Sequence, residues 1–258
     1  KTKMPPDPFM RKQLYSLLKP ADMCRRQVNI IGNNLALRKS SELYTILEKN
    51  GFSIKDICTC HDFREYETMA SSRLNLVTNP LGRPAAKELC GRLGQEWVYL
   101  PVSYDWEQIR EHWKCLSDLL ELDFDSIWKE GEMDQLWQKA ETAMETLAGE
   151  LAGWSVAIDY TASSRPFGMA KLLVKCGFRV ERIYADTISP EEEDTYAWLK
   201  KQCPRMLLCP TVYHKMAVLP RTWCREAGGK VLAIGQKAAY FTGTSHFVNM
   251  VEDGGLYG

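Results

Sequence analysis

Val28-Asn29-Ile30-Ile31-Gly32 and Val156-Ala157-Ile158 are the two stretches that decide the fold. Each is a short apolar run bounded by polar residues or glycine, a pattern that predicts a buried β-strand. The residues after the first run predict further strands at 52–57, 74–77 and 97–102, with helices at 61–71, 84–93 and 106–152. The residues after Val156-Ala157-Ile158 predict helices at 166–175 and 191–201, and strands at 179–184, 206–209 and 231–234.

Strands that alternate with helices are typical of βαβ crossovers and parallel sheets. Two such series, on either side of Gly149, predict two doubly wound units rather than one. We therefore expect an α/β protein of two Rossmann-like parallel-sheet domains that face a common cleft. The expected limits are a proline-rich lead-in at 1–26, a first domain at 27–150 and a second at 151–258, truncated at its C-terminal end.

Composition excludes several classes of partner. The chain has 258 residues, with 33 basic and 33 acidic side chains, so its net charge gives no reason to expect nucleic acid or an anionic membrane. No apolar run approaches the ~20 residues that span a bilayer. Nine cysteines, an odd number without a secretory signal, predict reduced thiols and a cytoplasmic location.

Candidate ligand residues follow from the topology, because ligands of such sheets bind beyond the carboxyl ends of the strands, at a topological switch point. Any one of these residues could instead cap a helix or shape a turn. The Cys58-Thr59-Cys60-His61 stretch is the nearest to a metal-ligand cluster, and its alternative is a strand end with buried thiols. The strand ends nominate Asn33, Asn34, Cys60, Asn79, Ser103, 161–165 (with Ser163, Ser164 and Arg165), Thr211 and Gln236.

Common catalytic motifs do not occur. The first strand ends in Gly32-Asn33-Asn34-Leu35 and not in GxGxxG, and the sequence has no phosphate-binding GxxxxGK[ST], no GxSxG and no HExxH. A dinucleotide, a nucleoside triphosphate and a hydrolase triad are therefore unsupported.

Three stretches together resemble the nitrogenase component 1 family, which includes molybdenum–iron protein subunits, cofactor-assembly scaffolds and dark-operative protochlorophyllide reductases. Residues 28–32, followed by Leu47 to Phe52, are similar to the opening of the family's second domain. Residues 153–160, followed by Arg165-Pro166, are similar to the opening of its third domain. Residues 246–249, running to 254–258, are similar to a late family segment. The resemblance covers nearly the whole chain from residue 27.

The resemblance implies an oxidoreductase that holds a metal–sulfur cofactor or a tetrapyrrole-like substrate in the cleft between its domains. Its implied partners are an ATP-dependent iron–sulfur reductase, which supplies electrons, and a paralogous component 1 subunit. By position, His246 matches a histidine ligand of the active-site cofactor and Arg165 a loop arginine beside it. We therefore expect Arg165, Asn79, Ser163, Ser164 and Thr211 to contact the cofactor or substrate, and His246 and Cys60 to bind metal, with His246 within reach of Arg165 and the Asn79 loop.

Departures from the family pattern leave alternatives open. Residues 77–83 contain no cysteine where the family anchors its cofactor. The chain looks like a fragment, and we carry forward the alternative that it is inactive and holds no cofactor by itself. Two further functions are therefore carried forward. One is a non-catalytic cofactor carrier or assembly scaffold, and the other is a two-lobed protein that binds a small molecule.

Overall fold

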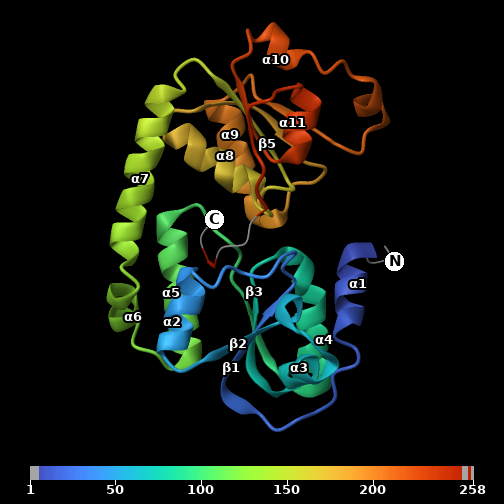
Figure 1. Ribbon diagram of the computed structural model, residues 1–258, viewed down its shortest axis with the longest axis vertical. Coiled ribbons are helices and arrows are strands. Elements are labelled where there is room, and N and C mark those ends of the chain that lie inside the picture. Colours follow the sequence, from blue (N-terminus) through green and yellow to red (C-terminus); the bar gives the residue numbers. More distant parts are fainter. Residues whose placement is uncertain (1–5, 252–254, 257–258) are drawn as a thin grey trace. The chain divides into compact units, whose positions relative to one another are not determined.

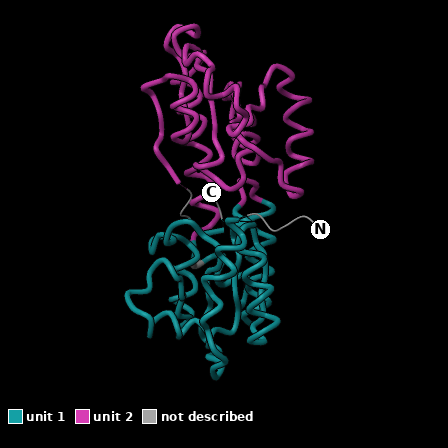
Figure 2. Tube along the Cα trace, turned by 90° about the vertical axis from the view of Figure 1, so that its right-hand side faces the viewer, with its two compact units in different colours: residues 1–102, 107–131, 253–258 teal, residues 103–106, 132–252 magenta. Residues whose placement is uncertain are grey.

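Two all-parallel sheets organise the chain, and each belongs to a separate unit (Figures 1 and 2). The computed structural model describes residues 6–251, 255 and 256. Unit 1 comprises residues 1–102, 107–131 and 253–258, and unit 2 comprises residues 103–106 and 132–252. The predicted α/β class with two parallel sheets is confirmed.

The sheet of unit 1 has the strand order β2-β1-β3-β4, with every neighbouring pair parallel. The strands are β1 (Cys24–Ile31), β2 (Ser53–Asp56), β3 (Ser72–Val77) and β4 (Glu96–Tyr99). The helices are α1 (Pro6–Leu14), α2 (Glu42–Lys49), α3 (Phe63–Glu67), α4 (Arg83–Leu93), α5 (Trp106–Leu120) and α6 (Phe124–Glu130), with 3-10 turns η1 (Ile57–Thr59), η2 (Thr68–Ser71) and η3 (Pro80–Gly82).

A buried polar network fixes the register of this sheet. Asn29 of β1 is opposite Asn75 of β3, and its Nδ2 donates to Asn75 Oδ1 at 2.8 Å. Ser72 Oγ donates to Asn29 Oδ1 at 2.7 Å, and Gln95 Nε2 donates to the Ser72 carbonyl at 3.1 Å. A shift of one residue would leave these buried amides without partners, which is costly in a low-dielectric interior.

The predicted helical stretch at 106–152 is mainly helical, but it consists of three helices, α5, α6 and α7 (Met133–Glu150). Glu121, which follows α5, and Glu132, which precedes α7, have positive φ values of 57° and 50°. This left-handed backbone interrupts the helical stretch at both positions. Trp113 of α5 is 1% exposed, and Trp106 stacks on Trp137 with ring centroids 4.9 Å apart.

The sheet of unit 2 has the strand order β7-β6-β5-β8-β9, again all parallel. The strands are β5 (Ser155–Asp159), β6 (Arg179–Tyr184), β7 (Leu207–Cys209), β8 (Val231–Ile234) and β9 (Phe247–Val248). The other elements are α8 (Pro166–Lys175), η4 (Pro190–Glu192), α9 (Glu193–Gln202), η5 (His214–Val218), α10 (Trp223–Glu226) and α11 (Gln236–Thr242).

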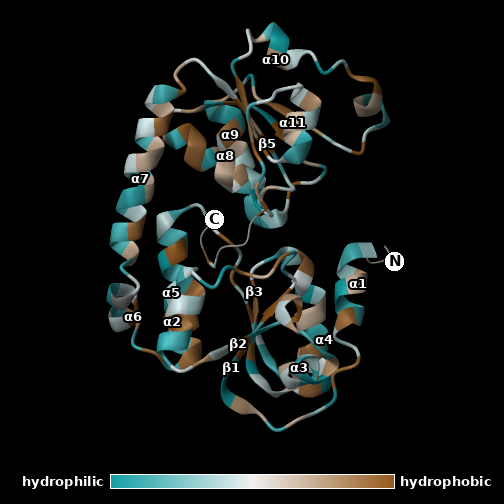
Figure 3. Cartoon of the chain, in the orientation of Figure 1, coloured by the Kyte–Doolittle hydropathy of each residue, from teal (hydrophilic) through white to brown (hydrophobic). Residues whose placement is uncertain are grey.

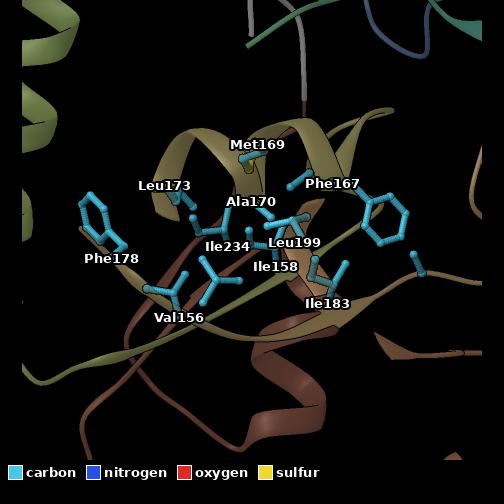
Figure 4. Packing of buried hydrophobic residues seen from close by; sticks show 13 residues of the cluster. Val156, Ile158, Phe167, Met169, Ala170, Leu173, Phe178, Ile183, Leu199 and Ile234 are labelled. Atoms are coloured by element: carbon cyan, nitrogen blue, oxygen red, sulfur yellow. The ribbon is translucent and has the colours of Figure 1, made fainter. Parts of the chain in front are cut away.

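Hydrophobic packing covers both faces of this second sheet. On one face, Ile158 and Ile183 pack with Phe167, Ala170 and Leu199 of α8 and α9 (Figure 4). On the other, Ala157 and Tyr184 pack with Met216 of η5 and Ala238 of α11. Alternate residues of β5 therefore point to opposite faces, as in any sheet that is buried on both sides.

Helix α7 packs with the second sheet, since Met144 and Ala148 contact its hydrophobic core. Along the sequence, unit 1 gives way to unit 2 between residues 131 and 132, whereas the predicted domain limit is residue 150. The predicted domains, 27–150 and 151–258, stay a prediction about folding units. In the part of the chain that the structure describes, no helix is long and apolar enough to cross a membrane.

Candidate strand-end site

Each sheet has one point where the strand order reverses, between β1 and β3 in unit 1 and between β5 and β8 in unit 2. Parallel strands on either side of such a point leave a crevice beyond their carboxyl ends. The loops there decide whether a ligand can enter.

Two glycines close the crevice of unit 1. A Cβ added to Gly32, where φ is +94°, would lie 2.3 Å from the Cα of Gly82. A Cβ added to Gly82 would lie 2.5 Å from the Ile31 carbonyl oxygen. Backbone therefore packs on backbone between the β1 and β3 loops, and this contact leaves no room for a methyl group.

Helix α1 covers the same strand end. Arg11 donates to the carbonyl oxygens of Gly32 and Asn33 at 2.9 and 3.0 Å, and to Asn34 Oδ1. Asn33 Nδ2 donates to Asp56 Oδ2 at 2.7 Å. The nominated residues Asn33 and Asn34 are thus bonded within the chain.

The thiols that follow β2 surround a buried carboxylate. Asp56 is fully buried and accepts a hydrogen bond from the Cys58 backbone N–H at 2.9 Å. Burial raises the pKa of Asp56, although hydrogen bonds from Cys58 and Asn33 act in the opposite direction. Burial, followed by the nearby charge of Asp56, raises the pKa of Cys58 to about 11.

Cys60, predicted to bind metal, is half-buried, and its Sγ donates to the Asp56 carbonyl at 3.5 Å. Burial raises the pKa of this thiol as well, whereas a metal ligand must be a thiolate. Across the described residues, no group of three or more His, Cys, Asp or Glu side chains is arranged to hold a metal ion. None of the nine cysteines forms a disulfide.

Asn79, predicted to contact a cofactor, shapes a turn. Its side chain is 9% exposed, and Oδ1 accepts a hydrogen bond from the Leu81 backbone N–H at 3.0 Å. This is an Asx turn that begins η3.

In unit 2 a carboxylate fills the switch point. Asp159, at the end of β5, is fully buried and accepts hydrogen bonds from the backbone N–H groups of Thr161 at 2.7 Å and Ala238 at 2.6 Å. A Cβ on Gly235 would lie 2.4 Å from Asp159 Oδ2, so glycine is required there. Asp159 thereby ties the β5 loop to the first turn of α11.

Next to this anchor, polar side chains from four strand ends meet at a half-exposed rim. Lys237 of α11 donates to the hydroxyls of Tyr160 and, at 3.4 Å, Thr211. Thr211 Oγ1 donates to Asp186 Oδ2 at 2.6 Å, and the Val212 N–H donates to Asp186 Oδ1 at 2.9 Å. We call Tyr160, Asp186, Thr211 and Lys237 the rim cluster.

The rim cluster is electrostatically paired. Partial burial acts to raise the pKa of Asp186, but the hydrogen bonds from Thr211 and Val212 and the charge of Lys237 together lower it. Lys237 also lies 4.3 Å from the centroid of the Tyr160 ring. The cluster therefore presents an ammonium and two hydroxyls beside an ionised carboxylate.

The predicted residues of the β5 loop lie on the same side of the sheet. Ser163 is 1% exposed, and its Oγ accepts from Tyr104 Oη at 2.7 Å and from the Arg165 N–H at 3.0 Å. Ser164 is half-buried, and Arg165 is 7% exposed at the N-cap of α8. Since β7 lies two strands from β5, the start of this loop is about 10 Å from Thr211.

His246 lies at the other end of the sheet. It precedes β9, its ring contacts the edge of Trp154 with centroids 5.0 Å apart, and Trp154 precedes β5. Arg165 follows β5, so the expected proximity of His246 to Arg165 is not found. The role of His246 as a metal ligand stays a prediction, but Arg165 is not its neighbour. Residues 252–254 and 257–258 of the third motif lie outside the described residues.

A cavity of about 390 Å³ opens at the amino ends of the strands in unit 1, lined by Arg25, Arg73 and Gln95 among others. Gln95 Nε2 already donates to three backbone carbonyls, and Arg73 pairs with Glu121 at 2.6 Å. Gln95 and Arg73 are thus engaged within the chain.

A family comparison decides what kind of protein carries these features. The sequence model described as nitrogenase component 1 type oxidoreductase matches residues 9–223. The chain belongs to this family. Solved structures of nitrogenase Cp1 at pH 6.5 and pH 5 share its fold, with TM-scores of 0.61 and 0.58 at 13% and 16% identity. They cover 92% and 91% of this component 1-type chain, which spans 55% and 53% of theirs. No curated protein matches it.

Sequence reasoning found Thr211 but missed the other three residues of the rim cluster in this component 1-type chain. Tyr160 directly follows β5, and Lys237 lies three residues beyond Ile234, the last residue of β8. Both positions satisfy the strand-end rule, so the signal was present in the sequence. Asp186 lies two residues beyond β6, and only its contact with Thr211 distinguishes it from an ordinary surface carboxylate.

Proposed function

We propose that this chain is the substrate-holding part of a nitrogenase component 1-type oxidoreductase. Its ligand is a carboxylate-bearing organic molecule of the tetrapyrrole-like class, bound at the rim cluster. The observation that carries the proposal is the Lys237 ammonium, held beside the Tyr160 and Thr211 hydroxyls at the carboxyl ends of the second sheet. This is the edge at which parallel α/β sheets bind ligands.

The donor set supports an organic carboxylate. The Lys237 ammonium and the Tyr160 hydroxyl can donate charge-assisted hydrogen bonds to carboxylate oxygens, which are worth about 1.5–3 kcal/mol each. The Thr211 hydroxyl already donates to Asp186. Arg165, which is 7% exposed, follows the same strand end at the N-cap of α8. A propionate group therefore suits this edge.

A metal–sulfur cofactor fits the described residues less well. Iron–sulfur clusters need thiolates or imidazoles. Cys60 lies in unit 1, and among the residues that the structure describes no group of three or more His, Cys, Asp or Glu side chains is arranged to hold a metal ion. His246 lies at the opposite strand ends from Arg165. We therefore derive no step that involves a cluster.

Family membership extends the proposal to partners. In such an oxidoreductase, electrons arrive from an ATP-dependent iron–sulfur reductase, and a paralogous subunit completes the assembly. The residues of this chain would bind and orient the substrate: Lys237 and Tyr160 would hold a carboxylate, and Ser163 would keep the Arg165 loop in place.

Protoporphyrin IX, which carries two propionates, is the probe for this proposal. Its absorbance and fluorescence are titrated with the anaerobically purified chain, and iron and labile sulfide are measured in the same preparation. Lys237→Ala should weaken binding by about 10-fold to 100-fold, as expected for the loss of one charge-assisted hydrogen bond. Lys139→Ala, an exposed lysine of α7, is the matched control and should leave binding unchanged.

Equal affinities of the two variants would contradict the site. Stoichiometric iron and sulfide without porphyrin binding would instead favour the carrier or scaffold function. A metal-free chain that binds no porphyrin would favour the two-lobed binder of a different small molecule.

A further inference from the structure

The loop between β7 and α10, residues 210–221, lies along helix α11. It starts at Thr211, beside Lys237 in the first turn of α11. It ends at Arg221, whose guanidinium stacks 3.5 Å from the ring centroid of Tyr240, one turn further along the same helix. Between these points, Met216 points inward and packs with Ala238. The loop is therefore held at both ends and in its middle.

The outer side of this loop is apolar. Val212 is 80% exposed and Val218 is 79% exposed, with Leu219 at 51% and Tyr213 at 46%. Hydrophobic residues are visible along the loop to the right of α11 (Figure 3). Single exposed apolar residues are ordinary, but four on one anchored loop are a candidate for a binding surface.

The part of unit 2 that carries this loop is strongly basic. Residues 199–251 contain one acidic residue, Glu226, against eight basic ones. Residues 132–198 of the same unit contain twelve acidic and six basic residues. The eight basic residues are Lys200, Lys201, Arg205, Lys215, Arg221, Arg225, Lys230 and Lys237. Of these eight, Lys215 and Arg221 lie in the loop, Arg225 lies on α10 just beyond it, and Lys237 contacts Thr211. Lys200 and Lys201 lie on α9, which packs on the opposite face of the sheet.

We propose that loop 210–221, together with Tyr240, is a docking surface for a protein segment that carries acidic and aromatic or aliphatic side chains. Pairing with a second copy about a two-fold axis would bring like charges together, which opposes it. Arginines stacked on aromatic rings, Arg221 on Tyr240 and Arg182 on Trp223, are held in fixed orientations that suit directional hydrogen bonds to carboxylates. Tyr, Trp, Met and Arg are also the residues enriched at protein interfaces. A lipid surface needs no such fixed geometry.

The probe is a random copolymer of glutamate and tyrosine, compared with polyglutamate and with phosphatidylserine vesicles. Binding to the whole chain is measured by fluorescence anisotropy at low and high salt. The copolymer should bind more tightly than polyglutamate, because it supplies both charge and apolar contacts, and high salt should weaken it. Vesicle binding that exceeds copolymer binding would overturn the assignment in favour of a membrane.

A matched pair of double variants locates the surface. Lys215→Glu with Leu219→Ser reverses one charge and removes one apolar contact from the loop, and it should weaken copolymer binding about tenfold or more. Lys139→Glu with Leu147→Ser makes the same changes on α7, where Leu147 is 40% exposed, and should have no effect. Equal losses in both variants, or no loss in either, would contradict the proposal. Porphyrin binding should be unchanged in both, which separates this test from that of the rim cluster.

Discussion

Both sheets are built from parallel strands that alternate with helices, but the carboxyl ends of their strands differ. In unit 1 the strand end is sealed by the chain itself, through the contact of Gly32 with Gly82 and the hydrogen bonds of Arg11. In unit 2 the seal is a single buried carboxylate, Asp159, and next to it Lys237 and Tyr160 remain half-exposed. The same fold thus gives one closed edge and one edge that is open to a ligand.

Ligands of parallel α/β sheets bind beyond the carboxyl ends of the strands. The difference shows that this rule identifies the edge of the sheet where a ligand could bind, but not whether the loops there leave room for one. At the closed edge, every nominated side chain whose contacts we describe is bonded within the chain: Asn33 to Asp56, Asn34 to Arg11 and Asn79 to the turn that follows it. At the open edge, Thr211 and Lys237 are also bonded within the chain, but Lys237 and Tyr160 remain half-exposed.

The largest expected effect comes from breaking the seal of unit 1. Gly32→Ala places a Cβ 2.3 Å from backbone at a positive φ, so we expect a loss of about 3 kcal/mol or more in the free energy of unfolding, measured by urea denaturation. Gly51→Ala is the control, because φ there is +76° but nothing lies within 4 Å of the added Cβ. It should cost only the ~1–2 kcal/mol of the left-handed conformation. Equal losses would mean that the two loops are not in tight contact.

The buried carboxylate of unit 2 should come next. Asp159→Ala leaves the N–H groups of Thr161 and Ala238 without acceptors, and we expect it to destabilise the chain by about 2–3 kcal/mol. Asp186→Ala, at the exposed rim, should cost less than about 1 kcal/mol. Thermal unfolding of both variants checks the order, and a reversed order would show that the rim is part of the core.

A smaller effect is expected from the pH dependence of the closed edge. The pKa of Asp56 is raised in the folded state, so the stability that it contributes is fully present below its unfolded pKa of about 3.9 and is lost as the pH rises through the folded pKa. Wild type should therefore gain stability relative to Asp56→Asn as the pH falls from 7 towards 4. Urea titrations across this range measure the difference. A gap between the two proteins that does not change with pH would contradict the burial of an ionised Asp56.

The smallest stability effect is expected where the ligand effect is largest. Lys237→Ala at the open edge removes hydrogen bonds to Tyr160 and Thr211 from a half-exposed site, so we expect less than about 1 kcal/mol in unfolding. Circular dichroism melts of the variant and of Lys139→Ala check this. A loss of several kcal/mol would make Lys237 a structural residue and would undermine its role as a ligand donor.

Much of the fold was predictable because its signals are local. Helix 166–175 and strands 179–184 and 231–234 have the predicted bounds. Strand β9 was missed, since two residues, Phe247 and Val248, are too few for a periodic pattern. Helix α11 was missed because Asp159, which caps it, lies 79 residues away in sequence.

The site was harder to predict, because it depends on which loops become neighbours. Thr211 was nominated by its place after a strand, but its partners Lys237 and Asp186 come from two other loops. His246 was nominated by resemblance, and only the register of β8 with β9 shows that it lies at the amino ends of the strands. Residue type and spacing along the chain predict neither the neighbours of Thr211 nor the strand end at which His246 lies.

Hydrogen–deuterium exchange with and without protoporphyrin IX tests the central claim most directly, because it compares the two edges in one molecule. We expect the ligand to protect the backbone amides of 159–165, 211–212 and 235–238, which surround the open edge, and to leave those of 32–34 and 79–83 unchanged. Protection at 32–34 and 79–83, with none at 235–238, would contradict the account.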